Sequence, residues 1–272
     1  MRTTAEKAEA FRALHARAEA FVIPNAWDVG TARLLARLGF EALATTSAGF
    51  AFAAGQRDNS IGRERILHHV ETLVAATDLP VSADLENGFG DAPAAAAETI
   101  RLAAATGLAG GSIEDATGRA DEPIYAFDLA VERVRAAAEA AHAGPHPFTL
   151  TARAENFLVG RRDLADTIRR LQAYQEAGAD VLYAPGPTTR ADIAAVVSSV
   201  DRPVNVLAGL AGMDLDLAAL SGLGVKRVSI GSALARVAFG AFLRAAEAMR
   251  TRGTFELGGA VSYADLSGMF DP

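Results

Sequence analysis

Two carboxylates separated by a single residue stand at the end of an apolar, alternating stretch of the chain. In residues 81–86, Asp84 and Glu86 fall on one face of a predicted strand, and the apolar residues fall on the other. Two acids so close together repel each other, and they stay ionised only where a cation compensates them. Mg²⁺ fits such a site because it takes few protein ligands plus water and substrate oxygens, with Mn²⁺ as the alternative ion. Two surface acids on an edge strand are the simpler interpretation of this pair taken alone.

A third carboxylate and an arginine occupy comparable positions on two later stretches. In residues 111–115 the alternation aims Glu114 in the same direction as the first two acids, which makes it a third candidate metal ligand. In residues 148–153 it aims Arg153 there, where a guanidinium can hold the carboxylate of an anionic substrate in bidentate geometry. A capping or salt-bridging role is the alternative for Glu114, and charge balance is the alternative for Arg153.

Hydroxyl and small residues follow another predicted strand. Thr46, Ser47 and Ala48 lie in a predicted turn whose backbone N–H groups can cradle a carboxylate or phosphate oxygen, although an ordinary turn fits the local sequence equally well. Asp58 lies in the long polar loop that comes next, where a mobile lid is expected. A solvated loop residue is the simpler interpretation of Asp58.

The elements that must position these side chains alternate regularly along the chain. Each predicted strand is followed by a predicted helix, an order that favours a single (β/α)₈ barrel over an open doubly wound sheet. Polar residues recur at the carboxyl ends of several strands, and in a closed barrel those ends converge on one mouth. The predicted strands are residues 21–24, 42–47, 81–86, 111–115, 148–153, 181–184, 204–207 and 227–230.

The whole chain reads as one domain, residues 1–272, with the barrel at about residues 20–250. A helix over residues 5–18 precedes the barrel, and a helical extension follows it. The tail, residues 251–272, is too apolar for a free end, so we expect it to pack on this subunit or on another one.

Composition excludes several classes of function. The chain has 26 basic and 33 acidic residues, a net charge of −7, and no dense Lys/Arg cluster, so nucleic acid is not an expected partner. Cysteine is absent, which excludes disulfides, thiolate metal sites and a cysteine acid or nucleophile. No leader-like segment and no run of about 18 apolar residues is present, so we expect a cytoplasmic protein without a membrane partner. His68 and His69 face different directions on a predicted helix, and we interpret them as surface residues.

Taken in order, the motifs resemble those of the isocitrate lyase / phosphoenolpyruvate mutase superfamily over residues 20–246. The resemblance implies a (β/α)₈ barrel that binds a 2-oxo acid or its enolate with Mg²⁺. It also implies a homo-oligomer, a tetramer or a dimer, in which the last barrel helix is exchanged between subunits. The motifs are Pro24-Asn25-Ala26-Trp27-Asp28, Thr45-Thr46-Ser47-Ala48-Gly49, Arg57-Asp58, Asp84-Leu85-Glu86-Asn87-Gly88-Phe89-Gly90, Ile113-Glu114-Asp115 and Ala152-Arg153.

The resemblance also implies roles for individual residues. Asp84 would ligate Mg²⁺ directly, whereas Glu86, which stands where the family usually has Asp, and Glu114 would act largely through water. Arg153 would grip the substrate, and Asp58 would match an aspartate of the gating loop. The expected site is catalytic at Asp58, Glu114 and Arg153, substrate-binding at Trp27, Thr46, Ser47, Ala48, Asp84 and Arg153, and metal-binding at Asp84, Glu86 and Glu114.

One departure from the family narrows the expected chemistry. True isocitrate and methylisocitrate lyases carry a Lys-Lys/Arg-Cys-Gly-His loop after the fourth strand, but residues 116–123 contain no lysine, histidine or cysteine. The loops of the mutases and phosphonopyruvate hydrolases are not matched either. We therefore predict a Mg²⁺-dependent carbon–carbon lyase or decarboxylase for a small 2-oxo dicarboxylate, like oxaloacetate or 2-oxoglutarate, with a metal-stabilised enolate. The alternatives are a phosphonate enzyme like phosphoenolpyruvate mutase or phosphonopyruvate hydrolase, and a non-catalytic 2-oxo acid binder.

Overall fold

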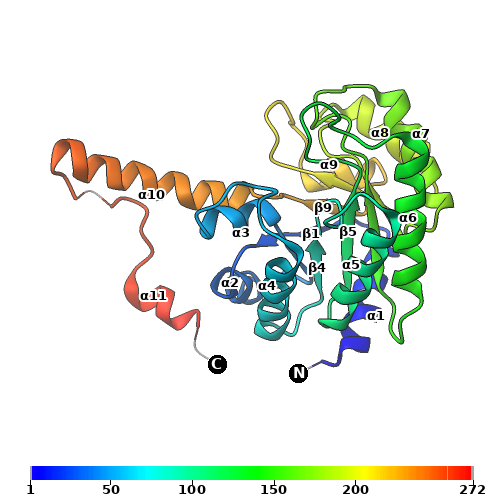
Figure 1. The fold of residues 1–272 in the computed structure, drawn as a ribbon. Helices are drawn as coiled ribbons and strands as arrows, with labels where there is room; N and C mark the ends of the chain where they lie inside the picture. The colour runs from blue at the N-terminus through cyan, green and yellow to red at the C-terminus, as the bar shows by residue number, and fades with distance from the viewer. Residues whose placement is uncertain (1, 256, 271–272) are drawn as a thin grey trace.

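The strands of the computed structural model, which describes residues 2–255 and 257–270, are all parallel and form one ring (Figure 1). They pair in the order β1-β9-β8-β7-β6-β5-β4-β3-β2, and because β1 and β2 are neighbours in the chain, this order closes the barrel. The predicted (β/α)₈ fold is confirmed. The strands are β1 (Phe21–Ile23), β2 (Asn25–Ala26), β3 (Leu43–Thr45), β4 (Val81–Asp84), β5 (Gly110–Glu114), β6 (Thr149–Arg153), β7 (Val181–Tyr183), β8 (Val204–Leu207) and β9 (Arg227–Ser229).

The strand predicted at residues 21–24 is divided at Pro24. Proline has no N–H group and cannot donate to the ladder, so the pairing on one side of the strand stops there. On its two sides β1 pairs with β9 and β2 pairs with β3. The two short strands therefore occupy the position of one barrel strand, and together they close the ring.

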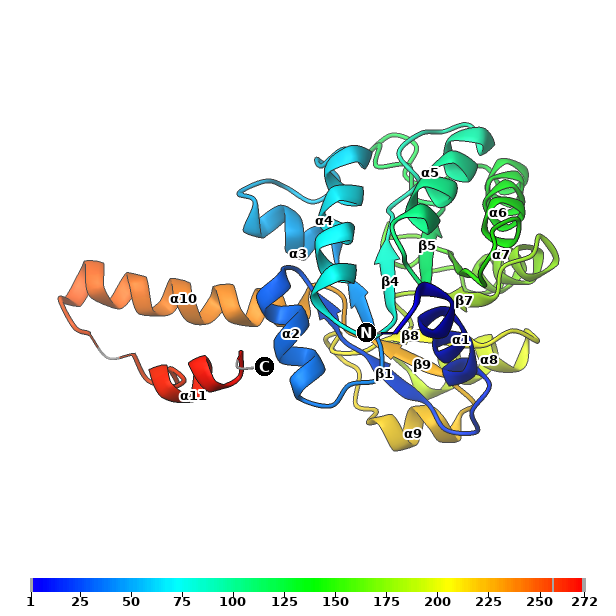
Figure 2. The same cartoon turned by 90° about the horizontal axis from the view of Figure 1, so that it is seen from below.

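Helices cover the outside of the ring (Figure 2). A helix, α3, forms where the sequence predicted a turn and a loop, because the Thr46 hydroxyl accepts the backbone N–H of Gly49 and caps it. The helices are α1 (Thr4–His15), α2 (Val29–Arg37), α3 (Ser47–Ala53), α4 (Arg63–Ala76), α5 (Pro93–Ala105), α6 (Phe127–His142), α7 (Leu164–Glu176), α8 (Arg190–Ser198), α9 (Leu217–Gly222), α10 (Ala233–Arg252) and α11 (Tyr263–Gly268).

The apolar core lies between the strands and the helices, whereas the inside of the ring is polar. Leu150 and Leu182 face outward into the core, and their strand neighbours alternate with them. Thr151, Asn205 and Ser229 are buried inside the ring. The interior of such barrels is usually filled by bulky branched apolar residues, so this polar interior requires hydrogen-bond partners or a ligand.

The last helix of the barrel, α10, extends away from the ring in both views (Figures 1 and 2). Val237, Phe242 and Leu243 on this helix are 67%, 66% and 63% exposed. The end of the tail returns to the barrel, where Met269 and Phe270 line a shallow cavity with residues of α2. Of the predicted tail, positions 256, 271 and 272 lie outside the described residues. Within the described residues, no helix combines the length and the apolar character needed to span a bilayer.

Candidate active site

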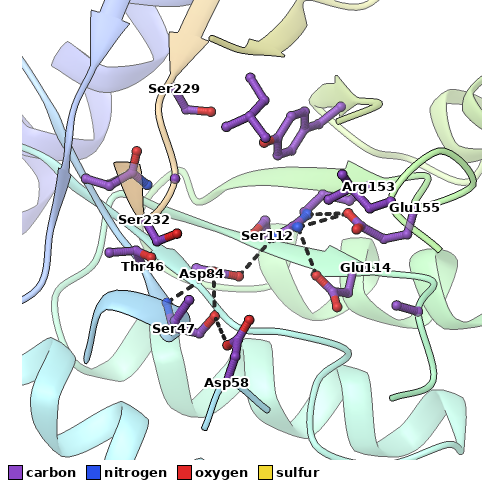
Figure 3. A pocket seen from close by; sticks show the side chains of 18 of the residues that line it. Thr46, Ser47, Asp58, Asp84, Ser112, Glu114, Arg153, Glu155, Ser229 and Ser232 are labelled. Atoms are coloured by element: carbon purple, nitrogen blue, oxygen red, sulfur yellow. Dashed lines mark hydrogen bonds and ion pairs between the residues drawn. The ribbon is translucent and has the colours of Figure 1, made fainter. Parts of the chain in front are cut away.

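A cavity of about 600 Å³ opens at the carboxyl ends of the strands. In a closed parallel barrel these ends share one mouth, so side chains from distant parts of the sequence meet there. Figure 3 shows Asp84, Glu114 and Arg153 pointing toward one another across this cavity. The three residues therefore lie together, as strand alternation predicted.

Arg153, the last residue of β6, is the electrostatic centre of the cavity. Its Nη1 lies 3.0 Å from Asp84 Oδ1, and its Nη2 lies 3.1 Å from Glu114 Oε2 and 2.9 Å from Glu155 Oε1. The guanidinium also lies over the ring of Tyr183, 5.1 Å from the ring centroid. Burial alone would lower the pKa of Arg153, but the negative charges of Glu155, Glu114 and Asp84 raise it, so the group is a permanent cation.

Asp84, the last residue of β4, is held by hydrogen bonds to the neighbouring strand β3 and to helix α3. Its Oδ2 lies 2.8 Å from the Ser47 hydroxyl and 3.2 Å from the Ser47 backbone nitrogen, both donors. The Asp84 backbone N–H donates to Thr45 Oγ1 at 2.9 Å. The same Ser47 hydroxyl lies 3.3 Å from Asp58 Oδ1, so the exposed loop after α3 reaches the rim of the cavity. Through its backbone N–H and its carboxylate together, Asp84 thereby joins β3, α3 and β6.

Glu86 does not continue the strand, contrary to the predicted span of 81–86. β4 ends at Asp84, and Glu86 has a left-handed backbone with φ of 50°, which an L-residue adopts only where the surroundings enforce it. Its side chain is buried, and in the described residues it forms no salt bridge. Burial, and then the charges of Asp84 and Asp58, raise the pKa of Glu86 to about 8. The neutral form of Glu86 is therefore favoured near neutral pH, and a cation bound beside it would favour the charged form.

Glu114 and Glu155 flank Arg153, and Glu155 is buried whereas the side chain of Glu114 is 10% exposed to the cavity. Burial raises the pKa of both groups, and the positive charge of Arg153 opposes that rise. The neighbouring Asp115 faces the other way, as strand alternation predicts, and it accepts from Arg170 Nη1 at 3.1 Å and from the hydroxyl of Tyr174. Its other oxygen accepts the Glu155 backbone N–H at 2.8 Å, which ties the end of β5 to the end of β6.

The donor set fits a hard divalent cation that keeps water and substrate oxygens. Around Arg153, carboxylates outnumber guanidinium groups, since Arg153 pairs with three acids while Glu86 forms no salt bridge among the described residues. Across those residues, no group of three or more His, Cys, Asp or Glu side chains converges closely enough to hold an ion by itself. Mg²⁺ is commonly bound by one or two carboxylates with waters. Asp84 lines the cavity, whereas Glu86, the second predicted ligand, is buried just outside the lining.

Residues 11–250 match the model of the phosphoenolpyruvate phosphomutase family. The chain belongs to this family. A protein from Burkholderia cenocepacia J2315 described as a candidate lyase/mutase has a crystal structure that is 65% identical, covers 99% of this chain and 97% of its own, and superposes with a TM-score of 0.96. The predicted superfamily membership is confirmed.

Relatives of this family member include enzymes that cleave carbon–carbon bonds. The oxaloacetate decarboxylase of Paraburkholderia xenovorans strain LB400 is 28% identical over 89% of this chain and 81% of its own length. The 2-methylisocitrate lyase of Salmonella typhimurium strain LT2 is 31% identical over 64% of this chain and 61% of its own. A phosphonopyruvate hydrolase of the same fold, 24% identical over 96% of this chain and 95% of its own with a TM-score of 0.82, is known in complex with oxalate and Mg²⁺.

The other residues predicted for the site of this phosphomutase-family chain lie in two places. Thr46, Ser47, Ala48 and Asp58 line the cavity. Trp27 is outside the lining and packs under α3, where a Cβ on Gly49 would come within 3.1 Å of the tryptophan Cβ.

The cavity of this family member also contains residues that the sequence did not single out as site residues. Strand alternation contains the signal for those on strands, such as Ser112 and Ser229, because each lies two residues from another inward-facing position. Ser232 lies outside the strands, at the start of α10. The segment 116–123 contributes to the rim, where Arg119 forms salt bridges with Asp91 and Glu122. The additional lining residues include Asn25, Ser112, Glu155, Tyr183, Asn205, Arg227, Ser229 and Ser232.

Proposed function

We propose that the protein is a Mg²⁺-dependent carbon–carbon lyase or decarboxylase that acts on a small 2-oxo dicarboxylate such as oxaloacetate or a 2-oxoglutarate relative. The observation that supports it is the excess of carboxylates around Arg153 at the mouth of the barrel. This charge balance suits a divalent cation together with an anionic, oxygen-rich substrate. The similarity to an oxaloacetate decarboxylase over most of the chain supports the same substrate class.

In this proposal Asp84 holds the ion directly. Glu86 and Glu114 hold it largely through water. Bound Mg²⁺ supplies the positive charge that a developing enolate oxygen needs. Asp84 is oriented for this task by Ser47 and by Arg153, so its carboxylate is fixed before substrate arrives. Arg153 directs its remaining donor capacity toward the substrate, and the loop that contains Asp58 covers the rim and excludes water.

The test is product analysis by NMR with oxaloacetate and 2-oxoglutarate, each with Mg²⁺ and with a chelator in its place. Because free Mg²⁺ promotes decarboxylation of oxaloacetate on its own, the reference is Asp84→Asn protein at the same Mg²⁺ concentration. We expect turnover by the wild type alone, and only with Mg²⁺. Equal product with both proteins contradicts the proposal.

A phosphonate enzyme is the second candidate, because the matching family model is that of phosphoenolpyruvate phosphomutase. Phosphonopyruvate presents the same 2-oxo acid to the metal and differs in its second acidic group. Turnover of phosphonopyruvate that exceeds turnover of oxaloacetate selects this candidate. Ligand-induced thermal stabilisation without turnover of either compound selects a 2-oxo acid binding protein.

We further propose that the chain forms a homo-oligomer through α10. The exposed apolar residues of this helix lie on a segment that projects from the barrel, and burying them in a partner subunit removes apolar surface from water. Light scattering after size exclusion measures the assembly. Phe242→Glu is expected to dissociate it, whereas Leu38→Glu, at an exposed leucine that follows α2, serves as the control.

A further inference from the structure

Arg227, the first residue of β9, is a buried cation that has only neutral partners. Its Nε donates to Asn205 Oδ1 at 2.9 Å and its Nη2 donates to Thr151 Oγ1 at 2.9 Å. Its Nη1 lies 3.3 Å from His15 Nε2. The His15 ring is neutral, because burial and then the charge of Arg227 lower its pKa to about 3. Among the described residues, no carboxylate forms a salt bridge with Arg227.

This arrangement leaves a positive charge without its counter-ion. Only 5% of Arg227 is exposed, and an unpaired charge at that depth costs several kcal/mol in typical proteins. Burial lowers the pKa of Arg227 to about 10, which leaves it protonated near neutral pH. A guanidinium has five N–H donors, and the three contacts to neutral groups use only part of them. The remaining donors are available to an anion.

The side chain is not sealed in the core, because it lines the same cavity as Asp84 and Arg153. Thr151, which accepts from Arg227, lies two residues before Arg153 on β6, and two residues along a strand span about 6.6 Å. In the register of the sheet, Asp84 pairs with Ser112 and Ser112 pairs with Thr151. Arg227 therefore lies on the floor of the cavity, about one layer of side chains below Arg153.

The charge pattern of the cavity is polarised from mouth to floor. Arg153 at the mouth is outnumbered by three carboxylates, so an incoming anion meets no net positive charge there unless a cation is bound. At the floor, Arg227 is accompanied by the amide of Asn205 and the hydroxyl of Ser229, which accepts from Asn205 Nδ2 at 3.0 Å. These neutral donors and acceptors can complete the hydrogen bonds of a carboxylate held by the guanidinium. A short molecule with an acidic group at each end spans the two levels.

We propose that Arg227, Asn205 and Ser229 form a subsite that binds the second acidic group of the substrate. The subsite selects molecules with two acidic groups over 2-oxo monoacids. This inference rests on the proposed function for the identity of the substrate, but the subsite itself can be measured as anion binding without turnover.

The matched substitutions are Asn205→Asp and Asn205→Leu. Asn205→Asp places an internal carboxylate beside Arg227 Nε and occupies the anion position, whereas Asn205→Leu has nearly the same size and adds no charge. The probes are acetate, malonate, succinate and phosphonoacetate in buffer with Mg²⁺, which offsets the excess of acids at the mouth. Because Asn205→Asp leaves the mouth unchanged, its comparison with the wild type isolates the subsite from metal binding. Thermal melting and far-ultraviolet circular dichroism report binding and folding.

We expect malonate or succinate at saturating concentration to raise the Tm of the wild type by about 5 °C, and acetate to raise it far less. Asn205→Leu is expected to lower the Tm and to keep part of this response, because the Arg227 guanidinium remains free to bind the anion, whereas Asn205→Asp is expected to raise the Tm and abolish the response. A phosphonoacetate response larger than the malonate response identifies a phosphonate as the second acidic group. Equal responses of wild type and Asn205→Asp, or an equal response to acetate, overturn the subsite.

Kinetics separates the failure of this inference from the failure of the proposed function. With a 2-oxo dicarboxylate, Asn205→Asp is expected to raise KM at least tenfold and to change kcat by a smaller factor, because it removes binding of a remote group. If no 2-oxo acid is turned over, the proposed function fails and the melting experiment still decides the subsite. Arg227→Lys retains the charge and is expected to keep part of the dicarboxylate response, which a purely structural arginine would not explain.

Discussion

Arg153 Nη1 lies 3.0 Å from Asp84 Oδ1, so a residue expected to grip substrate is bound to a residue expected to ligate metal. The same guanidinium reaches Glu114 and Glu155. Arg153 therefore compensates three of the clustered acids by direct contact, whereas Glu86 forms no salt bridge in the part of the chain that the structure describes. Because Arg153 contacts both the predicted metal ligand and the buried acids, substitutions of Asp84 and of Arg153 test metal binding and charge compensation separately.

Replacing Asp84 with Asn tests the metal-binding role without changing the size of the side chain. The amide lacks the charge that binds a divalent ion, so we expect kcat with Mg²⁺ to fall by about 10³-fold. Mg²⁺ affinity, measured by calorimetry, is expected to fall in parallel. Ser47→Ala, which removes one donor to Asp84, is the milder control, and we expect it to lower kcat by a smaller factor. A wild-type rate in Asp84→Asn contradicts the assignment.

Replacing Arg153 with Ala is expected to affect stability as strongly as substrate binding. The change leaves Glu114 and Glu155 buried without their cation, and breaking a buried pair in this way costs about 3–5 kcal/mol. Urea unfolding measures the free energy of unfolding. Arg153→Ala combined with Glu155→Gln removes one of the uncompensated charges and should recover part of the loss. A stability equal to the wild type in the single variant contradicts the role of Arg153 as the common counter-ion.

Strand alternation predicted the meeting of Asp84, Glu114 and Arg153, because parallel strands in a barrel present corresponding faces to one mouth. It failed at Glu86, whose left-handed backbone ends the alternation after Asp84. The helical pattern of residues 63–76 led to the interpretation of His69 as a surface residue, which is wrong: the ring is buried and stacks on Phe50 with the centroids 3.7 Å apart. That contact depends on α3, a helix that local sequence did not predict. The pair of His15 and Arg227 joins residues 212 positions apart, and no local pattern encodes it.

The buried His15 predicts a pH dependence of stability. Its Nδ1–H donates to the Phe11 carbonyl oxygen at 2.8 Å and its Nε2 faces Arg227, so a second proton would oppose the guanidinium. Because its pKa is about 3 when folded and about 6.5 when unfolded, the unfolded chain binds more protons between these values. The stability that neutral His15 contributes to the folded protein is complete above pH 6.5 and is lost as pH falls toward 3.

His15→Gln is the matched variant, since the amide keeps a donor and an acceptor and does not titrate. Between pH 7.5 and 5.0 we expect the free energy of unfolding of the wild type to fall by about 2 kcal/mol more than that of His15→Gln. Urea unfolding at the two pH values measures this difference, and comparison with the variant cancels the titration of distant groups. Parallel losses in the two proteins would show that His15 is not the responsible group.

Asp115 predicts a stability effect that acts through the strand ends of the site. Its carboxylate accepts from the Glu155 backbone N–H, from Arg170 and from Tyr174, which lie on the loop after β6 and on α7. Asp115→Asn keeps the volume, but it removes the charge opposite a buried guanidinium and turns one acceptor into a donor. Arg170 keeps its second partner, Asp166, at 2.9 Å, so we expect a loss of about 3 kcal/mol, the lower end for a broken buried pair.

Tyr174→Phe removes a single hydrogen bond and is expected to cost about 1–3 kcal/mol, because it leaves buried acceptor capacity unused. Since Asp115 holds Glu155 beside Arg153, Asp115→Asn should also lower kcat in the assay described above, while Tyr174→Phe should leave it close to wild type. If Asp115→Asn destabilised the protein without changing kcat, the link from β5 to the position of Glu155 would be structural only.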